Sequence, residues 1–196
     1  NRIRYLKSVR TLLVGTSGGE FTVSADGTDA AITPTNIVIK KQSSYGTANV
    51  DAQPAGNSIL FLQKAKRKIR ELSYNFDTDG YVAPDLTILN DIVTKSGINE
   101  MAYQQEPDSI LWCVRDDGIL AGLTYQRSEA VIAWHRHKLG GTFGTGSTAT
   151  GYGVVESVAS ISGQLTEDDF YVIVKRTING ATKRYVEAFA PFDFDE

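Results

Sequence analysis

Cysteine is nearly absent from this sequence, since Cys113 is the only one among 196 residues. A disulfide framework needs at least two cysteines and a cysteine-based metal site needs several, so the sequence predicts neither within this chain. With 41% apolar and 22% charged residues, the composition is typical of a soluble globular protein. A chain of this length buries a full core without disulfides or metals. We therefore expect no metal and no cofactor.

Long apolar runs are lacking too. No stretch approaches the roughly 18 apolar residues that suggest a membrane-spanning helix, so we expect no membrane span. A strong charge of one sign is also missing, because 20 Lys and Arg stand against 23 Asp and Glu, for a net charge of −3. This balance argues against a dedicated nucleic-acid binder. The sequence begins with Asn1, without an initiator Met or a signal-peptide pattern, and we expect it to be part of a larger protein.

Most of the chain alternates between apolar and polar residues with a period of two and is rich in Val, Ile, Thr, Tyr and Phe. This pattern predicts β-strands. Gly118 and Gly180, each following Asp or Asn, supply the positive φ of tight hairpin turns. The clearest predicted strands cover residues 11–14, 36–40, 58–62, 109–114, 130–134 and 170–174.

Two segments depart from the strand pattern. Residues 85–96 predict one short helix, with Asp85 as N-cap, Gly97 at the closing position, and an apolar face formed by Leu86, Leu89, Ile92 and Val93. Residues 140–153 contain six glycines and predict a flexible loop. No step in composition marks a domain boundary, so we expect one β-repeat domain over residues 1–196.

An internal repeat is the most informative feature. The segment from Ser58 to Tyr74 matches the one from Ser109 to Tyr125, 51 residues later, and looser copies begin near Thr11 and Asp169. Antiparallel strands repeating every ~40–50 residues are typical of β-propeller blades. The fold class we expect is all-β, with repeated antiparallel units in a partial propeller. Too few blades are present to close a ring, so further blades outside this sequence, a sandwich or an open array remain alternatives.

Few residues predict chemistry. His135 and His137 would share one face of a strand, as in some metal sites, but no third ligand is fixed by the spacing, which favours a half-exposed structural strand. Five carboxylates are expected in turns: Asp116, Asp117, Glu167, Asp168 and Asp169. A turn-forming role is favoured for them over acid–base catalysis, because none is paired with a second carboxylate at a defined place. Ser17 lacks the spacing of a nucleophile elbow, and the glycine-rich segments lack the context of a phosphate-binding loop.

Basic residues cluster at the tip of the second predicted hairpin. They are Lys64, Lys66, Arg67, Lys68 and Arg70. A solvated turn explains the cluster, and contact with phosphate, DNA or a partner is the functional alternative. Near the Asn179-Gly180 turn, further cations are expected to pair with Glu187 and Asp168, which would contribute little to stability.

A series of motifs resembles the central repeat region of bacteriophage and prophage tail proteins. The motifs lie at residues 18–21, 44–46, 112–118, 123–125, 133–137, 155–158, 174–180 and 184–187, in the same order. The chain is similar to the nozzle, tubular or packaged-DNA-stabilising proteins of short-tailed phages. The resemblance implies a virion component made in the bacterial cytoplasm and assembled with copies of itself and other tail proteins around a DNA channel. It implies no catalytic residue; Trp112 and Trp134 would be packing anchors, and Arg115 and Arg184 would bridge strands.

Two other functions stay open at this stage. Exposed aromatic residues, among them Tyr81, Tyr103, Tyr152 and Tyr185, together with the turn carboxylates, would suit a host-surface or carbohydrate-binding β-repeat module. A cellular β-repeat scaffold for protein partners would fit the same pattern. We expect the tail protein, a non-enzymatic assembly protein.

Overall fold

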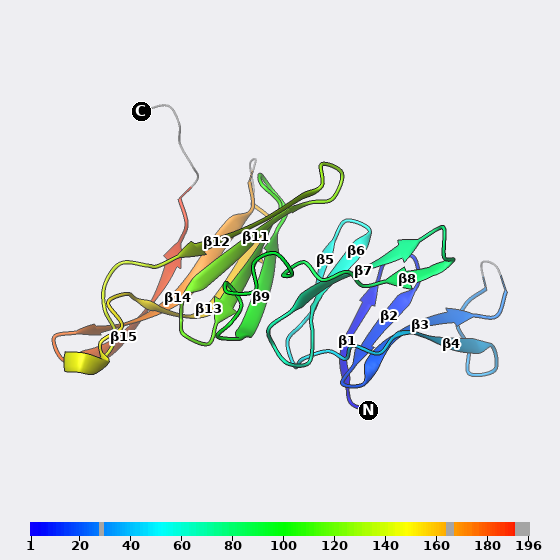
Figure 1. The fold of residues 1–196 in the computed structure, drawn as a ribbon, viewed down its shortest axis with the longest axis horizontal. Helices are drawn as coiled ribbons and strands as arrows, with labels where there is room; N and C mark the ends of the chain where they lie inside the picture. Colours follow the sequence, from blue (N-terminus) through cyan, green and yellow to red (C-terminus); the bar gives the residue numbers. More distant parts are fainter. Residues whose placement is uncertain (28–29, 164–166, 191–196) are drawn as a thin grey trace. The chain divides into compact units, whose positions relative to one another are not determined.

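The computed structural model describes residues 1–27, 30–163 and 167–190, and over this part the chain is almost entirely β-structure (Figure 1). Fifteen strands and one short 3₁₀ helix, η1 (Gly146–Thr148), account for its regular elements. The all-β class predicted from the sequence is confirmed. No helix within these residues is long and apolar enough to cross a membrane.

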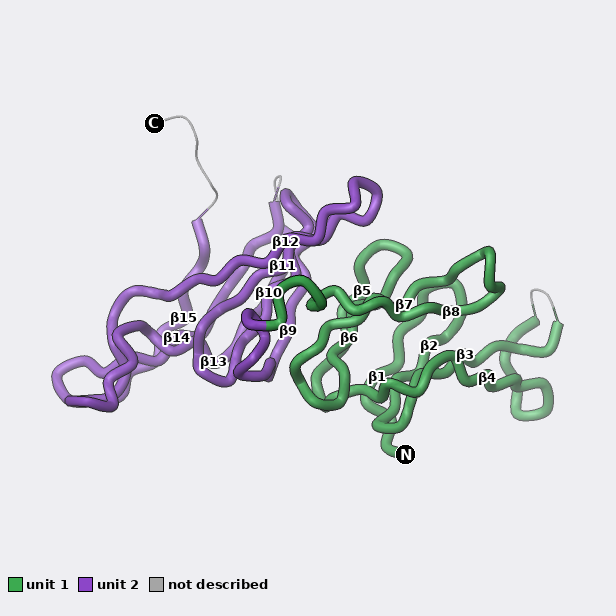
Figure 2. Tube along the Cα trace, in the orientation of Figure 1, with its two compact units in different colours: residues 1–91 green, residues 92–196 purple. Residues whose placement is uncertain are grey.

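The chain divides into two compact units, Asn1–Asp91 and Ile92–Glu196 (Figure 2). The boundary falls where the composition does not change, which is why the sequence did not indicate it. Each unit is described by itself.

Two antiparallel sheets make up the first unit, each a meander in which every strand pairs with the next. Residues from both sheets form its core, with Tyr5 and Leu13 from the first sheet and Ile59, Phe61 and Leu72 from the second. The two sheets therefore pack face to face and share one apolar interior. The first sheet comprises β1 (Ile3–Ser8), β2 (Leu12–Thr16), β3 (Gly19–Ala25) and β4 (Ile37–Ser43), and the second comprises β5 (Gln53–Ala55), β6 (Ser58–Leu62), β7 (Ile69–Asn75) and β8 (Gly80–Val82).

The second unit repeats the arrangement with one strand fewer. Its sheets comprise β9 (Ile98–Gln104), β10 (Ile110–Arg115), β11 (Leu120–Gln126) and β12 (Val131–His137), and then β13 (Val154–Ile161), β14 (Asp169–Ile178) and β15 (Ala181–Ala188). Trp112 and Val114 on β10 pack with Phe170, Val172 and Val174 on β14. The large aromatic side chains Trp112 and Phe170 are 5% and 2% exposed, so they supply much of this interior.

The four repeated hairpins predicted from the sequence are present. Each one is the second and third strand of its sheet: β2–β3, β6–β7, β10–β11 and β14–β15. The register differs slightly between copies, because Ile59 lies opposite Leu72 whereas Leu123 lies opposite Leu111 and not Ile110. Sheets of this strand order have the form of a propeller blade. Whether they surround a common axis stays a prediction.

The helix predicted over residues 85–96 is wrong, since the segment forms a series of turns. Its first residues extend the neighbouring sheet instead: Asp85 bridges to Arg70, and the backbone N–H of Leu86 donates to the carbonyl of Ile69. The expected apolar face is divided, because Leu86 and Val93 are buried while Leu89 and Ile92 are exposed. Tertiary pairing here overrides a helical pattern that is locally plausible.

Residues 140–153, predicted to be a flexible loop, are tied by hydrogen bonds. Thr150 Oγ1 accepts from the N–H of Phe143, and the N–H of Gly144 donates to Thr177 Oγ1. Leu139 and Gly153 close the loop through a β-bridge. Its glycines allow tight turns within this bonded arrangement, with positive φ at Gly141, Gly144, Gly146 and Gly151.

Candidate functional site

The basic cluster does not form one continuous charged patch. Lys64, Lys66 and Arg67 lie in the loop between β6 and β7, where Lys64 and Arg67 are exposed. Lys68 instead pairs with Asp85 at 2.7 Å. Burial by itself would raise the pKa of the Asp85 carboxyl, but hydrogen bonds from Lys68 and Thr87 outweigh it and lower that pKa. The charge of Lys68 is therefore offset inside the unit.

Arg70 lies on β7, beyond the loop, and is only 9% exposed. Its Nε donates to Gln63 Oε1 at 2.8 Å and its Nη1 donates to the carbonyl of Ala83 at 2.6 Å. The guanidinium carbon lies 3.5 Å from the centre of the Tyr45 ring, a cation–π contact. Arg70 thus joins β7 to the chain after β8 and fixes the orientation of Tyr45.

A groove of about 740 Å³ lies beside this pair, within the first unit. Its walls are mainly apolar. Gln42, on β4, links the neighbouring strands β8 and β3 through its side chain. Its Oε1 accepts from the N–H of Tyr81 at 3.2 Å, and its Nε2 donates to Thr22 Oγ1 at 3.0 Å. The lining comes from the end of β4 and the residues after it, from β7, and from β8 and the residues after it: Gln42, Ser43, Ser44, Tyr45, Arg70, Tyr81, Val82, Ala83 and Pro84.

His135 and His137 share one face of β12, as predicted, with His135 Nδ1 and His137 Nε2 2.7 Å apart. Both rings stand edge-on to Trp112, at centroid distances of 5.5 and 5.2 Å. Burial lowers the pKa of both imidazoles, and the neighbouring His137 lowers that of His135 further. Across the described ranges no group of three or more His, Cys, Asp or Glu side chains could hold a metal ion. The pair packs on the core of the second unit and is two ligands short of a tetrahedral zinc site.

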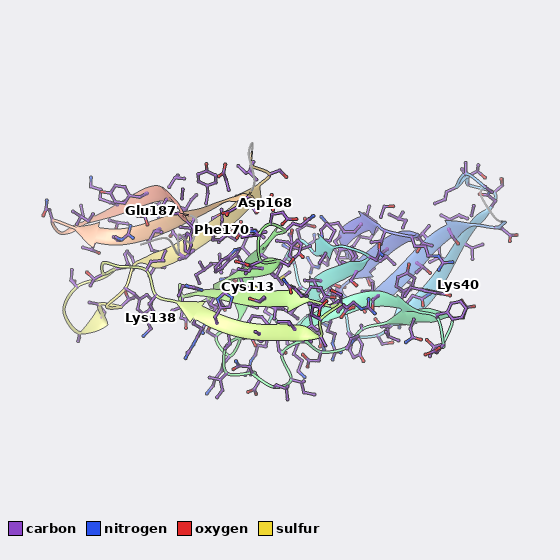
Figure 3. All side chains as sticks on the ribbon, turned by 90° about the horizontal axis from the view of Figure 1, so that it is seen from above. Lys40, Cys113, Lys138, Asp168, Phe170 and Glu187 are labelled. Atoms are coloured by element: carbon purple, nitrogen blue, oxygen red, sulfur yellow. The ribbon has the colours of Figure 1, made fainter. Side chains whose placement is uncertain are left out.

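The turn carboxylates are used structurally. Asp117 pairs with Arg115 at 2.6 Å and accepts from the N–H of Ile119, while Asp116 accepts from Asn99. Asp168, just before β14 and labelled in Figure 3, accepts from the backbone N–H groups of Gln105 and Glu106. These oxygens hold turns and loop ends, which is the structural role that the sequence favoured for them.

Ion pairs cross the β13–β15 sheet. Glu156 on β13 pairs with Lys175 on β14 and with Arg184 on β15, at 2.9 and 2.6 Å. These two hydrogen-bonded cations lower the pKa of Glu156 to about 2. Arg176 pairs with Glu187, as predicted, and Figure 3 labels Glu187 on β15. Arg184 therefore bridges strands as expected, whereas the cation partner predicted for Asp168 is replaced by backbone N–H groups.

The sheets differ in how much apolar surface they leave exposed. On β6 and β10, residues on both faces are buried, with Phe61 and Leu60 on opposite faces of β6 and Trp112 and Leu111 on opposite faces of β10. The first and last sheets each leave large apolar side chains exposed on one face, although Val14 and Val23 on that face of the first sheet are buried. Leu6, Ile37 and Ile39 are exposed on the face of the first sheet opposite Tyr5 and Leu13. We call this the β1–β4 outer face.

The last sheet has a comparable surface, the β13–β15 outer face, opposite Val172 and Val174. Ile173 lies directly across from Val186, and these side chains are 36% and 72% exposed. Tyr171 and Ala188 form the next pair on the same face. The β-strand alternation shows this face in the sequence, but it does not show which of two apolar faces is covered.

The tyrosines predicted for carbohydrate binding are divided between the two units, with Tyr81 in the first and Tyr103, Tyr152 and Tyr185 in the second. Tyr81 lines the groove. Tyr152 is half-buried and donates to the carbonyl of Asp117 at 3.1 Å, and Tyr185 lies on β15. The sequence did not indicate that Tyr45 lines a groove, although residues 44–46 belong to one of the motifs described above. The contact between Tyr45 and Arg70 could not be predicted, because the two residues are 25 positions apart in the sequence.

Comparison with models of known protein families gives no match for this chain, and comparison with curated protein sequences gives none either. The family resemblance of the motifs therefore stays a prediction.

Proposed function

We propose that this chain is a structural, non-enzymatic component of a bacteriophage tail, of the nozzle, tubular-ring or packaged-DNA-stabilising kind. It assembles with copies of itself and with other tail proteins, and it resides in the virion after synthesis in the bacterial cytoplasm. The observation that carries the proposal is the exposed apolar surface on the first and last sheets, at Leu6, Ile37 and Ile39 and at Ile173 and Val186.

Exposed apolar faces suit assembly for a physical reason. A β-repeat buries its two faces against neighbouring repeats, and terminal repeats that lack a polar outer surface need a further partner. Exposed clusters of large apolar side chains commonly mark protein–protein contacts. A tail protein that packs against other β-repeats would use these faces. The exposure of these faces therefore favours a protein that works as part of an assembly over one that works as a free monomer.

Contact with DNA is a secondary element of the proposal. Within the predicted basic cluster, Lys64, Arg67 and Lys68 are exposed, Lys68 while pairing with Asp85, and Arg70 is buried. Contact through a few loop cations would depend on salt and not on base sequence. This behaviour suits a channel through which DNA of any sequence passes.

The first experiment is to locate the protein in particles of the phage or induced prophage that encodes it, by mass spectrometry of purified particles and electron microscopy of their tails. We expect it in the tail at ring stoichiometry. Val186→Asp, which places a charge on the β13–β15 outer face, should reduce its incorporation. Ala181→Asp, an exposed change on the opposite face of the same strand, is the matched control. Absence of the wild-type protein from particles would refute the proposal and favour a cellular β-repeat scaffold.

A further inference from the structure

The groove between β4 and β8 has the size and the lining of a small-molecule site. Its volume of about 740 Å³ lies within the ~300–1,000 Å³ typical of such sites, which combine apolar walls with a few polar groups. The lining contains one cation, Arg70, and no carboxylate. A ligand that carries a negative charge would therefore meet an opposite charge and no like charge.

Tyr45 supplies a flat surface for a ring. One face of its phenol is covered by the Arg70 guanidinium at 3.5 Å, yet the side chain is still 42% exposed. Because the covered face is fixed from below, the other face is held in place without further loss of side-chain freedom on binding. Tyr81 and Pro84 also line the groove.

Polar groups in the groove could orient a ligand with several hydroxyls. Arg70 uses Nε for Gln63 and Nη1 for Ala83, while Nη2 has no partner among the described residues and remains for an anion. The hydroxyl of Ser44 is exposed at the rim. A guanidinium that is already oriented by two hydrogen bonds suits a planar carboxylate better than a flexible lysine would.

From these features we infer that the groove binds an acidic oligosaccharide, in which one sugar ring stacks on the open face of Tyr45 while the carboxylate of a neighbouring sugar passes the edge of the ring and accepts from Arg70 Nη2. The apolar C–H face of a sugar suits the phenol ring, and its hydroxyls suit the polar rim. This inference goes beyond the proposed structural role and does not depend on it, because the groove is lined by none of the residues that define the two outer apolar faces.

The test is an NMR titration of the purified chain with two acidic probes, α-1,4-linked tri-galacturonate and sialyllactose. The neutral control is α-1,4-linked galactotriose. We expect at least one acidic probe to bind, with shifts of the Tyr45 and Arg70 signals, and the neutral sugar to bind about tenfold more weakly. Tyr45→Ala should weaken binding by a similar factor, the change expected on loss of one aromatic contact.

Tyr185→Ala is the matched variant, because Tyr185 is 44% exposed against 42% for Tyr45 but lies on β15. It should leave the affinity for the acidic sugar unchanged. Equal denaturation midpoints of the two variants would show that Tyr45→Ala still folds. The inference is overturned if neither acidic probe shifts the groove signals, if Tyr45→Ala binds as well as wild type, or if a tetrathymidylate oligonucleotide binds the groove more tightly than both acidic sugars.

Discussion

Trp112 stacks on Phe170, with ring centroids 4.6 Å apart and ring planes inclined by 16°. The contact joins β10 to β14 and so links the two sheets of the second unit, and Figure 3 labels Phe170 near the start of β14. Phe189 adds a third ring, 5.6 Å from Trp112 and 5.2 Å from Phe170. The indole N–H is satisfied, since it donates to Gln104 Oε1 at 2.9 Å. The core of this unit is therefore organised around one aromatic stack.

Removing the indole should destabilise the second unit strongly. We expect Trp112→Ala to lower the free energy of unfolding by about 3–5 kcal/mol, the usual cost of deleting a buried aromatic side chain. Val186→Ala, at a position 72% exposed in the same unit, should change it by less than about 0.5 kcal/mol. Urea denaturation followed by circular dichroism measures both. Similar losses for the two variants would contradict the central role of the stack.

Gly118 and Gly180, two glycines in hairpin turns, allow the cost of backbone strain to be measured separately from the cost of steric overlap. Gly118 and Gly180 have φ values of 78° and 75°, but a Cβ at Gly118 would lie 2.4 Å from Val154 Cγ1, whereas one at Gly180 would have nothing within 4 Å. Gly180→Ala should therefore cost only the left-handed backbone penalty of roughly 1–2 kcal/mol. Gly118→Ala should cost a further ~1–3 kcal/mol for the overlap. Equal destabilisation in denaturant titrations would show that Val154 moves aside at no cost.

The sequence predicted the strands well because strand propensity and turn formation both depend on residues close together in the chain. Short runs of β-branched, aromatic and other apolar residues predicted β6 and β10, and Gly118 and Gly180 marked the turns that the structure contains. The failure at residues 85–96 has a non-local cause. Leu86 is held by the carbonyl of Ile69 and Asp85 by a bridge to Arg70, neither of which is visible in a helical periodicity.

The candidate site was predicted only in part for the same reason. The five basic residues were correctly located around the β6–β7 hairpin, but strand alternation turns Arg70 to the face of Phe61, its cross-strand neighbour. There it meets Tyr45, which precedes the strand pair in the sequence. The groove depends on three segments that the chain brings together, and a local pattern cannot show such a meeting.

The histidine pair predicts a loss of stability in mild acid. Burial lowers the pKa of His135 and His137 in the folded chain, while in the unfolded chain they titrate near pH ~6.5. Below that pH the unfolded state binds more protons than the folded state does. The free energy of unfolding therefore decreases as the pH is lowered, until the pKa values of the folded state are reached. The window is thus from about pH 6.5 downward.

Urea titrations at several pH values between about 5 and 8 test this, since carboxylates with ordinary pKa values titrate mainly below that range. The double variant His135→Gln with His137→Gln should show a smaller decline in unfolding free energy over the window than the wild type does. An equal decline in both proteins would assign the acid sensitivity to other groups.

Glu156 predicts an effect at lower pH and of a different origin. Its pKa is lowered to about 2 by Arg184 and Lys175, from a usual value of 4.5. The stabilisation is therefore complete above the usual value and is lost as the pH falls from there towards the folded one. At neutral pH Glu156→Gln should cost about 1 kcal/mol or less, because the ion pairs lie on the surface and are screened.

The cost of Glu156→Gln should shrink as the pH approaches 2, where the wild-type carboxylate is protonated in the unfolded state and about half protonated in the folded state. Glu129→Gln, an exposed change in the turn between β11 and β12, serves as the control and should show little cost at any pH. Added salt should reduce the neutral-pH cost of Glu156→Gln, since screening weakens both of its ion pairs. A cost that persists unchanged at pH 2 would show that the Glu156 side chain stabilises the β13–β15 sheet by packing and not by its charge.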